Sequence, residues 1–323
     1  DVIDCVRNTY DIDSDEKIDV EDIQDTIEKC LMDIDKDVAK AYIIYRNERA
    51  KARDFKYNKE FYTTVLELLN GKKNDVSKEN ANKDPRQFFT MRDLVAGETC
   101  KKLYKDFTMD KKLLKLHNKG VVHVHDLDYR AMKAMTNCCL LNLKDMLENG
   151  TCIQGKLIHD IHSLQVAVTV TTQIIAAVGS SQYGGITINM SHLSPFVAKS
   201  KEKYEKIFST LNDKDEWVEK FLRKEIVDSM QTFQYQLNSL TTTNGQSPFI
   251  TVACNTNDVD DEYKDYTALL IEEFLKQRIK GMEGPNGNNI NPSFPKIVYI
   301  LTENNMEKDS KYYYLTDLAA ECT

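Results

Sequence analysis

The sequence predicts an α/β fold preceded by a small helical domain, and three observations support this. After residue 100, short runs rich in β-branched and aromatic residues alternate with stretches of helical spacing. Residues 248–252 and 294–300 have compact strand patterns, with an amphipathic helical pattern at 266–280 between them. Residues 18–54 carry helical spacing alone. We therefore place a helical domain at 1–54 and an α/β domain at 55–323.

The composition is that of a soluble globular protein. The 323 residues are 41% hydrophobic and 29% charged, with a net charge of −8. This acidic balance argues against a nucleic-acid binder and a basic membrane-surface protein, although a locally positive pocket can still hold a small anion. Because we find no apolar run of membrane-spanning length and no signal-peptide layout, the sequence predicts a cytoplasmic protein without a membrane partner.

Eight cysteines are scattered along the chain without a CxxC pair. This spacing argues against a zinc ribbon and against a thioredoxin-like motif. Irregular spacing in so long a chain also argues against a secreted disulfide scaffold. We expect most of these thiols to be reduced and buried, with one or two of them catalytic.

The first predicted domain is a pair of helices. The chain opens on Asp1 rather than Met, which suggests a processed or excised segment. The apolar residues of the first helix recur at three-to-four spacing: Ile23, Ile27, Cys30 and Leu31. Residues 33–37 interrupt it and a second helix follows from Val38. The polar residues 71–88 have the composition of a linker or exposed connection.

The stretch between residues 117 and 139 concentrates side chains that can do chemistry. It holds three His, two Asp and an adjacent Cys pair. Gly120 breaks the helical pattern of residues 88–116, and residues 121–125 then have the pattern of a short buried strand. A strand that ends in polar side chains delivers them to one rim of a core, where α/β proteins commonly place their active sites.

His123 and His125 would share one face of this strand, and Asp126 and Asp128 would follow at its end. Such a set could ligate a metal, act as general acid and base, or hydrogen-bond a polar ligand. An isolated His pair is weak evidence for a metal, whereas buried polar groups are usually hydrogen-bonded. We therefore favour hydrogen bonding to a substrate or a structural partner and assign no metal site.

Cys138 and Cys139 are neighbours on a second predicted strand. Because successive strand residues point to opposite faces, one thiol can face the polar rim while the other faces the core. Cys322 falls on an apolar helical face near the end of the sequence, for which a core position is the simpler explanation.

The remaining elements complete the α/β pattern. Residues 140–150 form a short helix that ends at Gly150. Residues 163–180 carry no charge and are too long for one strand, so we predict a buried helix. The glycines at 184–185 permit close backbone approach, and residues 194–241 are helical.

Six segments, in order from about residue 85 to the end, carry a resemblance to a known family. They are HNKGVVHVHDLDY, MTNCCLLNLKDMLENG, TTQIIAAVGSSQYGG, NGQSPFITV, FPKIVYILTENN and LAAECT. Together they closely resemble the anaerobic, class III ribonucleoside-triphosphate reductases, which are glycyl radical enzymes. The resemblance implies a ten-stranded α/β barrel with a finger loop inside, of which residues 55–323 are the N-terminal portion. The amino-acid sequence of residues 18–51 resembles the C-terminal half of an ATP-cone, a helical regulatory domain.

The resemblance also implies a reaction. In the family a glycyl radical passes to a finger-loop cysteine, and the resulting thiyl takes the 3′ hydrogen from the ribose of a ribonucleoside triphosphate. A second cysteine, after an Asn on a barrel strand, helps to remove the 2′ hydroxyl. Cys138 after Asn137 matches this pattern. Asn137, His123 and His125 would bind the ribose or support its pocket.

Other expectations concern effectors and partners. The family's ATP and deoxynucleotide effectors imply a homodimer whose interface holds the specificity site, and His159, His162 and Gln173 lie near its expected place. The radical implies an activase that uses S-adenosylmethionine and an iron–sulfur cluster, and the family also carries a C-terminal zinc module. The finger loop, radical glycine and zinc module belong after LAAECT. We therefore expect a truncated reductase, inactive alone.

Three alternatives stay open at this point. A glycyl radical acyltransferase has a similar barrel, but its adjacent cysteines lie on the finger loop rather than on a strand. A non-catalytic nucleotide-binding or dimerisation fragment fits the truncation. A His/Cys metalloprotein would use His123, His125 and Cys138 as ligands.

Overall fold

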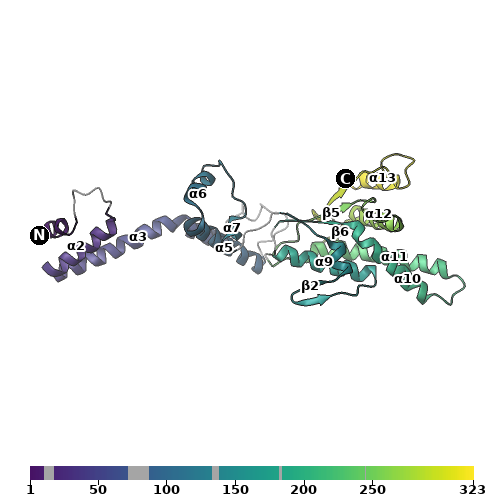
Figure 1. Cartoon of the computed structure of the whole chain (residues 1–323), viewed down its shortest axis with the longest axis horizontal. Helices are drawn as coiled ribbons and strands as arrows, with labels where there is room; N and C mark the ends of the chain where they lie inside the picture. The colour runs from purple at the N-terminus through teal and green to yellow at the C-terminus, as the bar shows by residue number, and fades with distance from the viewer. Residues whose placement is uncertain (11–17, 72–86, 133–137, 182–183, 244) are drawn as a thin grey trace. The chain divides into compact units, whose positions relative to one another are not determined.

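The structure is a computed structural model that describes residues 1–10, 18–71, 87–132, 138–181, 184–243 and 245–323 (Figure 1). It forms two compact units, Asp1–Glu67 and Leu68–Thr323. The predicted linker at 71–88 falls almost wholly outside the described residues, as does Asn137.

The first unit is helical, as predicted. Helix α1 (Val2–Thr9) packs on α2 (Val20–Ile34), and α3 (Lys36–Leu69) follows after a single residue. That residue, Asp35, is extended, and its carboxylate accepts hydrogen bonds from the backbone N–H groups of Asp37 and Val38. An Asp that caps the next helix explains why the chain breaks here. The predicted interruption is confirmed, but it comprises Asp35 alone rather than residues 33–37, and the second helix begins at Lys36 rather than at Val38.

A cluster of charges holds α2 to α3. The Arg46 guanidinium donates to the carboxylates of Glu21, Asp25 and Glu28 at 2.5–2.7 Å. These hydrogen bonds, led by the one to Glu21, raise the pKa of Arg46. Helix α3 continues without interruption through residues 54 and 55. The domain boundary placed there therefore does not coincide with a break in secondary structure, and it stays a prediction.

The second unit begins with a helical segment. It contains α5 (Phe88–Leu103), the π-helical turn η1 (Tyr104–Thr108), α6 (Lys111–Asn118) and α7 (Leu127–Arg130). Asp110 caps α6 by accepting from the N–H groups of Lys112 and Leu113, and Gly120 follows the helix with a φ of +71°. The predicted helical pattern of 88–116 and its end at Gly120 are confirmed.

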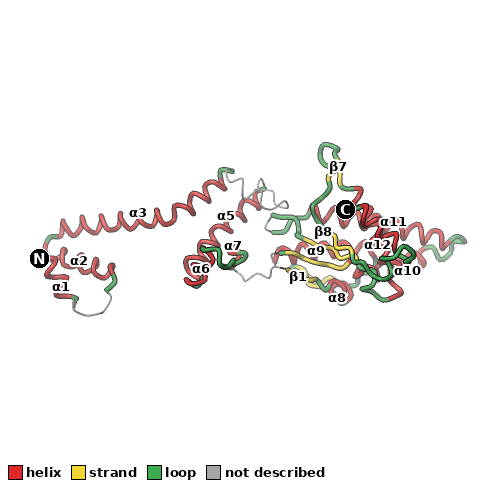
Figure 2. Tube along the Cα trace, turned by 90° about the horizontal axis from the view of Figure 1, so that it is seen from above, coloured by secondary structure: helices red, strands yellow, loops and turns green. Residues whose placement is uncertain are grey.

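A four-stranded parallel sheet forms the framework of the second unit (Figure 2). Its strands are β1 (Cys138–Leu140), β4 (Gly185–Asn189), β5 (Ile250–Cys254) and β8 (Lys296–Tyr299), in the order β1-β4-β5-β8. Helices lie between successive strands, so the predicted α/β class is confirmed. The sequential order is compatible with part of a barrel, but four strands do not close one, and the ten-stranded barrel stays a prediction.

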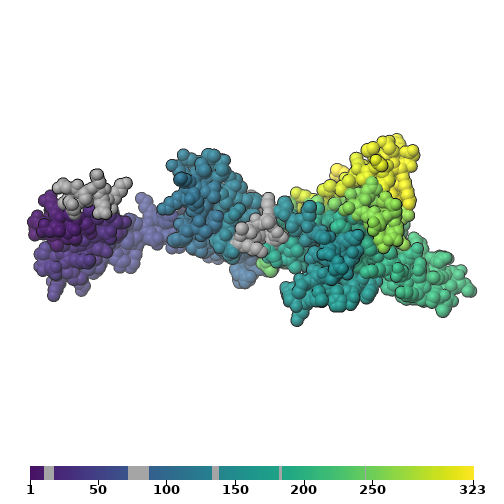
Figure 3. Space-filling view, in the orientation of Figure 1, coloured from purple at the N-terminus to yellow at the C-terminus, as the bar shows by residue number. Residues whose placement is uncertain are grey.

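The connections between these strands are mainly helical. The helices are α8 (Leu143–Glu148), α9 (Leu164–Ser181), η2 (Met190–Leu193), α10 (Ser194–Ile207), α11 (Lys214–Ser239), η3 (Asp261–Tyr263) and α12 (Lys264–Lys280). Two hairpins, β2 (Thr151–Ile153) with β3 (Lys156–Ile158) and β6 (Met282–Glu283) with β7 (Asn289–Ile290), interrupt them, and α13 (Tyr313–Glu321) follows β8. The α10–α11 pair extends beyond the sheet (Figure 1), and its residues form a green projection in the space-filling view (Figure 3).

Only one face of the sheet is packed against the helical core. Ile186 and Ile188 of β4 and Val252 of β5 are buried there, and the neighbouring Cys139 of β1 packs against the same core. The opposite face is open among the described residues: Leu140 is 83% exposed and Cys138 is exposed. Parallel sheets are usually covered on both faces, so this open face is the unusual feature of the fold.

Helix α9 is the centre of the core. It is long and apolar enough to cross a membrane by length and composition, contrary to the expectation that no such run exists, but half of it is buried inside the protein. Buried contacts from α9 to α11 and α10 identify it as a core helix, as predicted for 163–180. Its first N–H groups are satisfied from α10 and α11: Ser200 Oγ accepts from Leu164 N and the Glu225 carboxylate accepts from Gln165 N.

Candidate functional site

The open face of the sheet places Cys138 at the amino end of β1. Cys138 is paired in register with Gly185 of β4 and its thiol is exposed. A Cβ built on Gly185 would lie 3.7 Å from Cys138 Sγ and 3.6 Å from the Phe249 ring, so the glycine leaves room beside the thiol. On the same side, Lys296 Nζ lies 4.6 Å from the centre of the Phe249 ring. A thiol, an apolar ring and a cation therefore share this part of the sheet.

The two adjacent cysteines are in different environments, as the strand alternation predicts. Cys139 is half-buried against the core, and this burial, with a smaller contribution from Cys138, raises the pKa of the Cys139 thiol. A raised pKa keeps a thiol protonated and unreactive at neutral pH. The exposed Cys138 is therefore the one of the pair that is open to a ligand.

The predicted strand at 121–125 is wrong. These residues form an exposed loop in which Val121 is 66% exposed, and Asp126 has a left-handed backbone with a φ of +52°. The Val124 N–H donates to His117 Nδ1 at 3.2 Å, which holds the loop against the end of α6. A strand needs a partner with which to exchange backbone hydrogen bonds, and here the local bond to His117 replaces it.

The loop nevertheless brings its imidazoles together. The His123 ring centre lies 5.6 Å from that of His125 and 5.7 Å from that of His117, and His125 Nδ1 is 3.5 Å from His123 Nε2. Both predicted substrate-binding histidines are exposed. Within the described part of the chain, no group of His, Cys, Asp and Glu has an arrangement that could hold a metal ion. Whether the cluster shares a ribose pocket with Cys138 and Asn137 stays a prediction.

The residues predicted to bind effectors lie at and after the β2–β3 hairpin. His159 Nδ1 is 2.7 Å from Asp160 Oδ2, and the backbone of Asp160 is left-handed with a φ of +58°. His162 is exposed just before α9, and Gln173 is exposed on that half-buried helix. All three side chains are accessible, but an effector site made from them stays a prediction.

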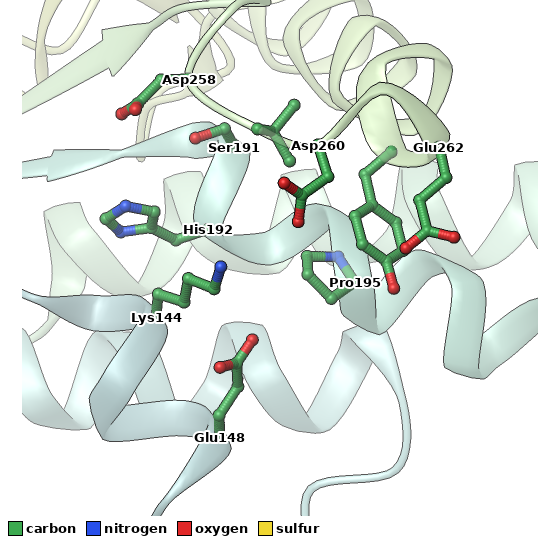
Figure 4. Close-up of a pocket in the computed structure, with 10 residues that line it drawn as sticks. Lys144, Glu148, Ser191, His192, Pro195, Asp258, Asp260 and Glu262 are labelled. Carbon is green, nitrogen blue, oxygen red and sulfur yellow. The ribbon is translucent and has the colours of Figure 1, made fainter.

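A cavity of about 210 Å³ lies at the carboxyl ends of β4 and β5, a location that sequence analysis missed (Figure 4). The labelled side chains around it are Lys144, Glu148, Ser191, His192, Pro195, Asp258, Asp260 and Glu262. Burial lowers the pKa of His192, and its Nδ1 is buried without a hydrogen-bond partner among the described residues. Because this lining holds four carboxylates and one Lys, it is negatively charged overall and repels phosphate. The cavity therefore does not suit a nucleoside triphosphate. The signal available in the sequence was the polar residues that directly follow each strand.

The other cysteines correct one expectation. Cys322 lies beside the core at the end of α13, which confirms the predicted apolar helical face. Cys254 is fully buried, and burial raises the pKa of its thiol to about 12. However, Cys152 is exposed, and Cys5 and Cys30 form a disulfide, so the expectation of mostly reduced, buried thiols is only partly correct.

Comparison with known proteins identifies relatives along almost the whole chain. The family model described as anaerobic ribonucleoside-triphosphate reductase matches residues 79–323, and the ATP cone domain model matches residues 1–51. The anaerobic ribonucleoside-triphosphate reductase of Haemophilus influenzae is 36% identical over 95% of this chain and 43% of its own length. That of Enterobacteria phage T4 is 38% identical over 79% of this chain and 42% of its own length. The chain thus spans about two fifths of these relatives.

Solved structures agree at the level of the fold. The anaerobic ribonucleotide reductase from Thermotoga maritima with citrate in the active site superposes with a TM-score of 0.53 at 14% identity, covering 85% of this chain and 52% of that one. A second anaerobic ribonucleotide reductase gives a TM-score of 0.52 at 16% identity, covering 85% of this chain and 48% of that one. The family model that covers residues 79–323 and the ATP cone match before it lead to one conclusion. The chain belongs to the anaerobic ribonucleoside-triphosphate reductase family.

Proposed function

We propose that this chain supplies the substrate-side thiol of an anaerobic reductase that converts ribonucleoside triphosphates to deoxyribonucleoside triphosphates. The observation that carries the proposal is the exposed Cys138 on the open face of the sheet, beside Gly185 and opposite the core-facing Cys139. Removal of a ribose 2′ hydroxyl as water requires a proton, which an accessible thiol can supply, while the two electrons of the reduction would come from a separate reductant such as formate or a small thiol protein. The family membership supports the reaction class.

The neighbouring residues have supporting roles in this proposal. The missing side chain of Gly185 admits the sugar next to Cys138. Asn137, His123 and His125 bind the ribose hydroxyls or support their pocket, which is inferred from the resemblance and from the accessible, clustered imidazoles. Lys296, a cation on the same face, is suited to lie near the negatively charged triphosphate.

The radical and its supply come from outside this chain in our proposal. The glycyl radical, the finger-loop cysteine and a zinc module would lie in the remaining three fifths of the relatives' length, and an activase with S-adenosylmethionine and an iron–sulfur cluster would generate the radical. When present, the radical supplies the hydrogen abstraction that no side-chain acid or base can perform on a ribose C–H bond. The residues of this chain then orient the sugar and hold the proton at Cys138 Sγ.

Regulation by nucleotides is a further part of the proposal. Residues 1–51, within the helical first unit, bind ATP or a deoxynucleotide, as their ATP cone match suggests. His159, His162 and Gln173 contribute to a deoxynucleotide specificity site at the interface of a homodimer. The exposed positions of α9, which include Val166 at 48% exposure, are suited to such an interface. A cytoplasmic location fits enzymes of nucleotide metabolism.

The test of the thiol assignment uses alkylation of the whole chain by iodoacetamide under anaerobic conditions, measured residue by residue by mass spectrometry. We expect Cys138 to react and to be protected by each ribonucleoside triphosphate, while Cys139 stays unmodified. The matched variants are Cys138→Ser and Cys139→Ser. Equal reaction of both thiols, or reaction at Cys138 that no nucleotide slows, would contradict the assignment.

A second candidate function is nucleotide binding or dimerisation without catalysis, and the ATP cone match at residues 1–51 favours the nucleotide-binding part of it. Calorimetry with ATP, dATP and dGTP, together with a mass measurement in solution, distinguishes a binding module from an inert chain. Anaerobic incubation with an activase, a reductant and a ribonucleoside triphosphate completes the test, since any deoxynucleotide formed shows that this chain is active alone.

A further inference from the structure

The Cys5–Cys30 pair lies in the helical unit and is separate from the thiols used in the proposed reaction. The two cysteines are bonded with a Cα–Cα distance of 6.2 Å, within the range of ordinary disulfides. Cys30 is 3% exposed on the packed side of α2, whereas Cys5 on α1 is only half-buried. The pair therefore joins a half-buried cysteine on α1 to a buried cysteine on α2.

Within the described part of the chain, little else fixes α1 to α2. None of the eight residues of α1 is buried, although the helix packs on α2, and its apolar residues Val2 and Val6 are only half-buried. Just after α1, the Tyr10 hydroxyl donates to Asp22 O at 2.7 Å and lies 2.8 Å from Thr26 Oγ1. An isolated helix of this length does not persist in water, so the covalent bond is the main restraint on its position.

We propose that Cys5 and Cys30 form a thiol–disulfide modification site that latches α1 onto α2 when oxidised and releases it when reduced. The co-reactant is a low-molecular-weight disulfide such as glutathione disulfide. The inference rests here on the cytoplasmic location of the proposed function: in such a reducing environment a protein disulfide is usually transient and regulatory rather than structural, which favours a reversible role.

The exchange proceeds in two steps. The different exposures of Cys5 and Cys30 determine which cysteine reacts first. The Cys5 thiolate attacks one sulfur of the small disulfide, a mixed disulfide forms on Cys5, and one small thiolate leaves and takes up a proton. The Cys30 thiolate then attacks Cys5 Sγ. The mixed disulfide between Cys5 and the small thiol breaks, and the second small thiolate leaves and takes up a proton. Two protein thiols are oxidised by two electrons, and one small disulfide is reduced to two thiols.

The experiment uses the whole chain equilibrated in glutathione buffers of different ratio, followed by peptide mapping without reduction. We expect a Cys5–Cys30 cross-link in the disulfide-rich buffer that excess glutathione reverses. Hydrogen exchange of residues 2–10 should be faster in the reduced protein by about tenfold or more, because local opening controls it. Both measurements use the unmodified sequence, so neither result depends on whether a variant folds.

Two variants test the order of attack, with Cys152→Ser as a control at an exposed cysteine outside the pair. Cys30→Ser should accumulate one glutathione on Cys5, whereas Cys5→Ser should leave Cys30 unmodified. The control should cross-link as the parent chain does. Separate glutathione adducts on both cysteines of the parent chain, or equal exchange rates for residues 2–10 in both redox states, would overturn the proposal.

Discussion

The carboxylate of Glu225 connects three helices of the core, and its neutralisation should destabilise the second unit measurably. It accepts hydrogen bonds from Ser200 Oγ at 2.8 Å, Lys203 Nζ at 2.9 Å, Tyr204 OH at 2.6 Å and the backbone N–H of Gln165 at 3.2 Å. The residue is 7% exposed, so water cannot replace these donors. We therefore choose Glu225→Gln as the perturbation, since it keeps the shape and removes the charge.

The loss in the free energy of unfolding depends on how many hydrogen-bond donors lose their acceptor. Glutamine offers one oxygen in place of two, and its NH2 group would face donors, so about two of the four hydrogen bonds are lost. Each hydrogen bond to a charged group contributes about 1.5–3 kcal/mol, and Lys203 can turn partly to water. The lower cost of burying a neutral amide offsets part of the loss. We expect the free energy of unfolding to fall by about 2–4 kcal/mol.

The assay is urea unfolding followed by tryptophan fluorescence. The only tryptophan of the sequence, Trp217, lies on α11 and reports on this helix. The matched control is Glu219→Gln, an exposed glutamate on the same helix, which should change stability by less than about 0.5 kcal/mol. Equal stability of the two variants would show that the buried carboxylate does not hold the helices together.

The same carboxylate gives a pH dependence with a defined sign. Burial by itself raises the pKa of Glu225, but the hydrogen bonds from Tyr204, Lys203 and Ser200 outweigh it, and the net pKa is lowered. A lowered folded-state pKa contributes stability above the unfolded-state pKa, and this contribution is lost as the pH falls through the folded-state value. Stability should thus drop on acidification below about pH 4.5, and the drop should be smaller in Glu225→Gln. An unchanged acid profile in the variant would contradict this assignment.

Three further predictions concern other parts of the chain. Phe274→Ala should lower the free energy of unfolding by about 3–5 kcal/mol, because the fully buried ring packs edge-on against Phe233; urea unfolding measures this, and a loss below about 1 kcal/mol would contradict it. Cys254 should resist alkylation at pH 8 until the protein unfolds, since burial raises its pKa to about 12; modification of the folded protein, detected by mass spectrometry, would oppose this. Arg46→Gln should lower the melting temperature of residues 1–67 more in low salt than in high salt, and a salt-independent effect in calorimetry would count against an ionic role for its three carboxylate partners.

The sequence predicted those features that depend on local periodicity. Alternation in a strand placed Cys138 and Cys139 on opposite faces, and the charge-free run at 163–180 identified the core helix α9. The predicted helix breaks near Asp35 and at Gly120 likewise depend on a short-range hydrogen bond and on local backbone conformation. Features of this kind are determined within a few residues, so one sequence suffices to predict them.

The features that sequence analysis missed depend on distant parts of the chain. The Val-rich segment at 121–125 has strand propensity, but it lacks a partner strand and is held instead by His117. The cavity beside His192 forms only when loops after β4 and β5 meet α8, and the Cys5–Cys30 bond requires α1 to dock on α2. The stabilising role of Glu225 likewise depends on donors up to 60 residues away.

The proposed chemistry requires that Cys138, and not Cys139, is the thiol that meets a ribonucleotide. The most decisive measurement is the anaerobic alkylation rate of each thiol in the presence and absence of ribonucleoside triphosphate. We expect fast modification of Cys138, slowed by the nucleotide, and slow modification of Cys139 under both conditions. Faster modification of Cys139, or a Cys138 rate that the nucleotide leaves unchanged, would show that the thiol has been assigned wrongly.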